Sequence, residues 1–132
     1  MSEVTTMSEA TTLLQNYSHG QRDFSGLSLT DANLSHTDLK GADFSYSELS
    51  NIDLSQANLR GADLSYATLN QVNLHEADLR GAMLIGTDLR DAKLQDANLK
   101  DADYILGSTQ FPIDFDPQQA QMSAIKLQTK HF

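Results

Sequence analysis

The chain has 132 residues, no cysteine and a formal net charge of −9 at pH 7. This length predicts a single domain, and the lack of cysteine excludes disulfides and thiolate chemistry. The acidic balance argues against direct binding to nucleic acid or to anionic membranes, because phosphate groups would be repelled. No apolar run approaches the ~20 residues that span a bilayer, and the N-terminus lacks the features of a secretory signal, so we expect a cytoplasmic protein that binds no membrane.

The first predicted element is a helix over residues 8–19. Ser8 suits the N-cap position and Gly20 the position after the C-cap, and three apolar residues between them follow one face at helical spacing. We expect this helix to cover the end of the next element. Residues 1–21 are therefore assigned to an N-terminal tail and a capping helix.

A repeat of five residues follows. Leucine or an aromatic residue recurs at every fifth position from Phe24 to Tyr104, in 17 consecutive units, with alanine two residues earlier in 10 of them and usually Asp or Asn directly before it. A step of five rotates by about 140° on an α-helix and changes face on a straight strand, so neither element points all the leucines inward. The chain must bend once per unit, at the two residues after each leucine.

The sequence also predicts how many sides close a coil. The strings LKGADF, LRGADL, LRGAML and LKDADY begin twenty residues apart, at Leu39, Leu59, Leu79 and Leu99. Twenty residues are four units, so the predicted cross-section is a square. Slightly more than four coils, stacked at about 4.8 Å, give a rod about 20 Å long over residues 22–106. The fold class is all-β, a quadrilateral parallel β-helix.

The segment after the repeat, residues 107–132, is predicted to seal the last coil. Asp116 and Pro117 form a plausible N-cap and N1 pair for a helix over roughly 117–128. An outward apolar patch lies near this end, and it is either covered by the C-terminal segment, which we favour, or left as a dimer or partner interface. Its four residues are Met83, Ile85, Ile105 and Leu106.

The chain resembles the pentapeptide-repeat family, with 17 units in phase over residues 22–106. Its LLxxYxxGxRDF string at the N-terminal side and its FPxxFDP string after the repeat are similar to those of small cyanobacterial-type members. The resemblance implies a right-handed β-helix and a protein that is not an enzyme. Ile52, Val72 and Leu27 depart from the small inward residue, so their coils must accommodate extra volume.

The outer surface carries one further candidate binding feature. Four cations share a column with a spacing of twenty residues: Lys40, Arg60, Arg80 and Lys100. They form either a lattice of ion pairs with nearby aspartates, each pair contributing little, which we favour, or a docking stripe for an acidic partner. Outward acidic columns diverge, so we predict no metal site, and the filled interior leaves no catalytic residues and no cofactor site.

The leading functional hypothesis is a non-catalytic protein-binding or regulatory module that acts through the faces of the rod. Two alternatives remain open. Family members linked to quinolone resistance imply a DNA mimic that binds DNA gyrase or topoisomerase, and a capped solenoid also fits a structural or assembly domain. The expected partner is another protein, and the expected state is a monomer or a weak homodimer.

Overall fold

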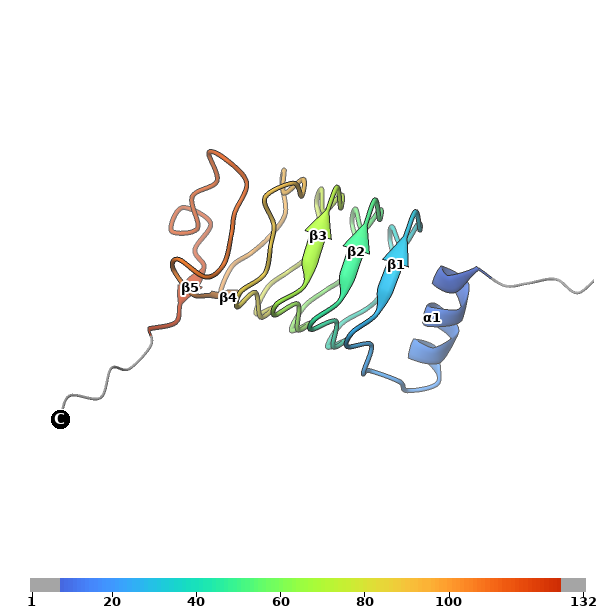
Figure 1. The fold of residues 1–132 in the computed structure, drawn as a ribbon. Coiled ribbons are helices and arrows are strands. Elements are labelled where there is room, and N and C mark those ends of the chain that lie inside the picture. Colours follow the sequence, from blue (N-terminus) through green and yellow to red (C-terminus); the bar gives the residue numbers. More distant parts are fainter. Residues whose placement is uncertain (1–7, 127–132) are drawn as a thin grey trace, which may run out of the picture.

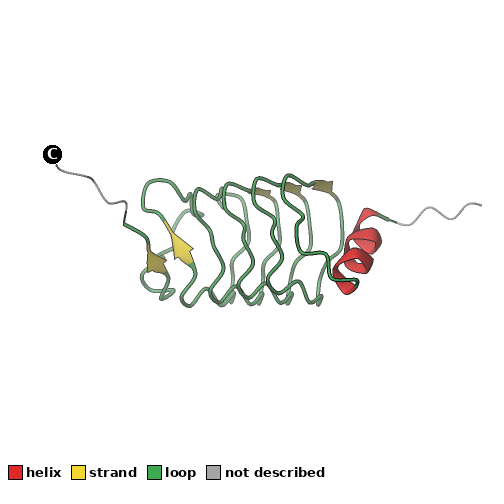
Figure 2. Cartoon of the chain, turned by 90° about the horizontal axis from the view of Figure 1, so that it is seen from below, coloured by secondary structure: helices red, strands yellow, loops and turns green. Residues whose placement is uncertain are grey.

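The computed structural model describes residues 8–126. Helix α1 (Glu9–Ser18) lies at one end of a stack of coils (Figure 1). Short strands mark the coils: β1 (Ser28–Thr30), β2 (Glu48–Ser50), β3 (Thr68–Asn70), β4 (Asp103–Tyr104) and β5 (Ser123–Ala124). Seen from below, most of each coil is turn or extended chain outside these strands (Figure 2).

The coils stack with the spacing that the sequence predicts. Strands β1, β2 and β3 form a parallel sheet in which Leu29 pairs with Leu49 and Leu49 with Leu69, steps of twenty residues. Isolated parallel bridges continue the same step on the other sides, for example between Asp38 and Asn58, and only the bridge between Asp88 and Gln110 among the described residues departs from it. The fold is a right-handed quadrilateral parallel β-helix, as expected.

The corners fall on the two residues after each inward leucine, also as expected. The second corner residue usually has a positive φ, for example 71° at Gly41 and 60° at Tyr46. Glycine adopts this conformation without steric cost, whereas other residues accept it only where the surrounding structure enforces it. The glycines that recur every twenty residues, Gly41, Gly61 and Gly81, are therefore corner residues and not a phosphate-binding loop.

Asp or Asn before the leucine fixes these corners through a local hydrogen bond. The side-chain oxygen accepts from the backbone N–H two residues later, at 2.9 Å from Asp43 to Ser45 and 3.1 Å from Asn58 to Arg60. The same bond recurs in coil after coil, as the sequence pattern suggests. Both residue types supply the same oxygen, so they exchange freely at this position.

Leucines fill the interior. The side chains of Leu49, Leu69 and Leu89 are 3%, 1% and 0% exposed. The larger residues Ile52 and Val72 are also buried, so their coils do accommodate the added volume. The core is thus continuous along the rod.

The C-terminal segment differs from its prediction. Residues 117–121 form a turn, and the chain then extends into β5, which pairs in parallel with β4. The predicted helix over 117–128 is therefore wrong up to Lys126, and its last two residues lie outside the described chain. Ser123 N–H donates to the Ala102 carbonyl at 2.8 Å, because the last coil presents unpaired backbone groups that a helix could not satisfy.

Candidate functional site

Among residues 8–126, no three His, Asp or Glu side chains gather where they could hold a metal ion. His75 contacts Glu76 at 2.8 Å through Nε2, and its Nδ1 lies 2.9 Å from the Gln95 carbonyl oxygen. Both side chains are well exposed, so the pair lies on the surface and not in a reaction cleft. No helix in the same range combines the length and apolar character needed to span a membrane.

The four predicted cations do form one column. Backbone hydrogen bonds join their coils, from Gly41 N–H to the Arg60 carbonyl at 2.9 Å and from Gly61 N–H to the Arg80 carbonyl at 3.0 Å. Parallel strands or coils lie about 4.8 Å apart, so each cation has a like charge above or below it. We call Lys40, Arg60, Arg80 and Lys100 the cationic column.

Only one member of the cationic column has an ion-pair partner within the described residues. Arg80 holds Asp78 through two bonds, Nε to Oδ1 at 2.9 Å and Nη2 to Oδ2 at 2.7 Å. These bonds lower the pKa of Asp78 below its ordinary value and raise that of Arg80. Within the described residues the expected ion-pair lattice is thus limited to one pair. The equivalent positions beside Arg60 and Lys100 are the neutral Asn58 and Asn98, and Lys40 forms no ion pair although Asp38 stands at that position.

A second pair of the same kind lies on another side of the rod. Arg90 holds Asp88 at 3.0 and 2.9 Å, and the arginine lowers the pKa of that carboxyl. Sequence reasoning did not single this pair out. The spacing of two residues across an inward leucine, identical to that of Asp78 and Arg80, is the signal that identifies it.

The C-terminal chain up to Lys126 leaves much of the predicted apolar patch exposed. The side chain of Leu106 is 84% exposed and that of Met83 is 39% exposed, whereas Ile85 and Ile105 are half-buried. The expectation that this segment covers the patch is therefore wrong for Leu106 and Met83. The segment extends the stack with β5 and packs Phe111 against Tyr104.

Two tyrosines that sequence reasoning did not assign to a site continue the patch along one corner. Tyr46 and Tyr66 are 66% and 52% exposed, and their rings stack with centroids 5.2 Å apart. The Tyr66 ring lies over Gly86, where an added Cβ would come within 2.5 Å of it. Leu106 lies twenty residues after Gly86 in the sequence, but the positive φ of that corner falls on Gly107 and not on Leu106. We call Tyr46, Tyr66, Gly86 and Leu106 the apolar corner.

The geometry defines a class of protein: a right-handed, four-sided β-helix of five-residue units with a filled interior. The chain belongs to the pentapeptide-repeat family. The family model of pentapeptide repeats matches 8 copies, over residues 23–61, 37–75, 57–96 and 73–103.

Solved structures agree with this membership. A pentapeptide repeat protein from Nostoc PCC 7120 (alr5209) is 48% identical, with a TM-score of 0.84 over 87% of this chain and 94% of its own. A pentapeptide repeat protein from the thylakoid lumen of Arabidopsis thaliana is 34% identical, with a TM-score of 0.63 over 67% of this chain and 60% of its own. No curated protein matches the chain.

Proposed function

We propose that the protein is a non-catalytic binding module that holds another protein against the outside of its β-helix. The interior supports this proposal, because leucine and alanine fill it and leave no internal ligand cavity along the central coils. Chemical variety is confined to outward columns. A partner large enough to lie along several coils is the natural ligand for such a surface.

The cationic column is the observation that carries the proposal. Within the described residues, Lys40, Arg60 and Lys100 form no ion pair of 4.0 Å or less. Their mutual repulsion is relieved by an acidic segment laid along the column. Because the whole chain has a net charge of −9, this positive stripe would orient such a partner and set the register of binding.

The apolar corner borders the same side of the rod. That side is formed by residues 42–46, 62–66 and 82–86, with the cationic column at one edge and Tyr46 and Tyr66 at the other. Exposed tyrosines are enriched among the residues that dominate binding energy. One partner lying across this side would contact charged and apolar groups together.

The test is affinity capture from a lysate of the source organism with the intact protein and two variants. One variant neutralises the unpaired cations (Lys40→Gln, Arg60→Gln, Lys100→Gln), and the control is Arg90→Gln, which removes one charge on another side. We expect a specific interactor that the control retains and the triple variant loses. The same interactors with all three proteins would refute the proposal.

A further inference from the structure

The N-terminal end of the rod is only partly closed by α1. Two side chains there supply the hydrogen-bond donors that a preceding coil would otherwise provide: Tyr17 Oη donates to the Lys40 carbonyl at 2.7 Å, and Gln21 Nε2 donates to the Asp23 carbonyl at 2.9 Å. In later coils the equivalent carbonyls accept backbone N–H groups from the coil before.

On the side of the square that contains β1, no described side chain supplies such a hydrogen bond. In the second coil, Glu48 N–H donates to the Leu27 carbonyl at 2.8 Å, and the Ser50 carbonyl accepts from Asp31 N–H at 3.0 Å. The equivalent groups of the first coil belong to Ser28 and Thr30, and no described residue forms a hydrogen bond with them. Among the described residues, β1 is therefore an edge strand whose outward donors and acceptors have no partner, and the β1-β2-β3 sheet ends there.

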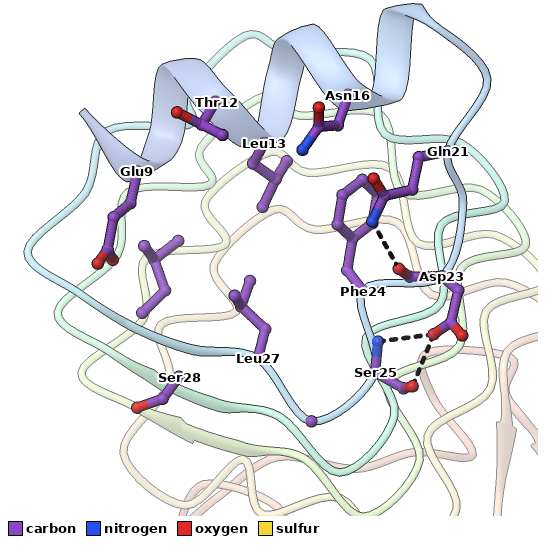
Figure 3. A pocket seen from close by; sticks show the side chains of 12 residues that line it. Glu9, Thr12, Leu13, Asn16, Gln21, Asp23, Phe24, Ser25, Leu27 and Ser28 are labelled. Carbon is purple, nitrogen blue, oxygen red and sulfur yellow. Dashed lines mark hydrogen bonds between the residues drawn. The ribbon is translucent and has the colours of Figure 1, made fainter. Parts of the chain in front are cut away.

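A groove lies between this edge and α1. Two cavities of about 470 and 590 Å³ flank the start of α1, and both are lined by Glu9, Ser28 and Leu29. Figure 3 shows Leu13 of α1 and Leu27 of the first coil pointing into the first of them. Leu27 is half-buried, whereas the residues at its position in the next two coils are 1% exposed. The first cavity is thus apolar inside.

The groove is also acidic at its rim. Glu9 lines both cavities, Asp23 lines the first and Asp31 the second, and none of the described residues that line either cavity is Lys, Arg or His. A ligand that carries positive charge beside an apolar side chain therefore complements it. This preference is opposite in sign to that of the cationic column, so the two surfaces suit different partners.

We propose that the groove binds an extended basic peptide segment of another protein, which adds a strand beside β1. Backbone groups of the peptide pair with those of Ser28 and Thr30, one apolar side chain enters between Leu13 and Leu27, and a neighbouring Lys or Arg faces the carboxylates. Strand addition at a free sheet edge is a recurrent mode of peptide recognition, in which backbone bonds supply affinity and pockets supply specificity. The proposal does not depend on the cationic column.

The probe is an acetylated and amidated heptapeptide that alternates lysine with valine. We expect it to slow amide hydrogen exchange at Ser28 and Thr30 by at least about tenfold at saturation, because each exchanging N–H gains a hydrogen bond. A heptapeptide of the same sequence with alternate amides N-methylated tests backbone pairing, and one that alternates glutamate with valine tests charge. Equal binding of the N-methylated peptide would reduce the interaction to charge alone and overturn the proposal.

Variants at one position separate pairing from folding. Thr30→Pro removes an N–H that points away from β2, and proline is tolerated at the edge of a sheet, whereas Thr30→Val keeps that N–H. We expect Thr30→Pro to weaken binding of the lysine–valine peptide about tenfold or more and Thr30→Val to leave it unchanged. Glu9→Gln with Asp31→Asn should weaken it a few-fold at low salt. Equal affinity for the proline and valine variants, with both folded by circular dichroism, would refute strand addition.

Two other occupants give distinct results. If the free protein is a dimer by sedimentation and Thr30→Pro makes it a monomer, a second copy fills the edge and the proposal is wrong. If the Ser28 amide is already protected in the free protein and loses protection when residues 1–7 are deleted, the chain fills its own groove, and the proposal is again wrong. A monomer with an exchanging Ser28 amide, protected only by the peptide, supports it.

Discussion

Truncation of single leucines within one column gives a direct test of the filled square interior. Leu54, Leu74 and Leu94 occupy one side in successive coils, yet Leu74 is 0% exposed whereas Leu94 is half-buried. Leu74→Ala removes about three buried carbon groups, worth about 0.8 kcal/mol each in transfer free energy. The cavity between two rigid coils adds to this, so we expect a loss of about 3–4 kcal/mol, within the range of buried leucine truncations.

Leu94→Ala is the matched control, with the same chemistry in the same column. It loses less buried area, and the groups around it can relax toward solvent, so about 1–2 kcal/mol is expected. Urea unfolding followed by circular dichroism and by tyrosine fluorescence measures both free energies, and coincident curves establish that unfolding is two-state. A loss for Leu94→Ala equal to or above that for Leu74→Ala would refute the stacked interior.

Four further predictions concern other parts of the molecule. Tyr17→Phe removes the donor to the Lys40 carbonyl and should lower the unfolding free energy by about 0.5–1.5 kcal/mol in urea, and an unchanged value would mean that water replaces the bond at no loss. Gly86→Ala should cost more than Gly61→Ala; both force a Cβ into positive φ, at roughly 1–2 kcal/mol, but only Gly86 also displaces the Tyr66 ring, which near-ultraviolet circular dichroism reports. Hydrogen bonds from Ser55 hold the pKa of Asp53 below its ordinary value of 3.8. The stability that these bonds add to the folded protein is therefore present above pH 3.8 and is lost as the pH falls through the lowered pKa. Asp53→Asn keeps the oxygen and should make the fall of melting temperature below about pH 4 shallower, and an unaltered profile would contradict this. Finally, we expect no inhibition of supercoiling by DNA gyrase at a large molar excess, because the cationic column interrupts the negative field on one side.

The repeating part of the fold was predictable because the residues within each five-residue unit determine the conformation of that unit. The step of five requires a bend, Asp or Asn before the leucine supplies the hydrogen bond that makes it, and the recurrence of LKGADF-like strings sets the number of sides. These are local rules that every coil repeats. The positions of Lys40, Arg60, Arg80 and Lys100 follow from them without further information.

The parts that failed or were missed depend on what lies beside them in space. Asp116 caps one turn, with its Oδ1 accepting from Gln118 N–H at 2.9 Å, but the free edge of β4 then outweighs the helical propensity that follows. The exposure of Leu106 depends on where that segment goes. The Tyr66 ring leans over Gly86, which lies twenty residues later in the chain, so periodicity marks the register and not the contact.

Because four five-residue units close each coil, the chain can change length only in certain steps if every residue is to keep its side of the square. An insertion or deletion of twenty residues leaves every later side chain on its original side and both ends still matched to their caps. A change of five residues would instead rotate everything after it by a quarter of a turn. Made between Arg60 and Arg80, it would move Arg80 and Lys100 of the cationic column to an adjacent side of the square. Evolution or engineering of longer relatives should therefore proceed in whole coils.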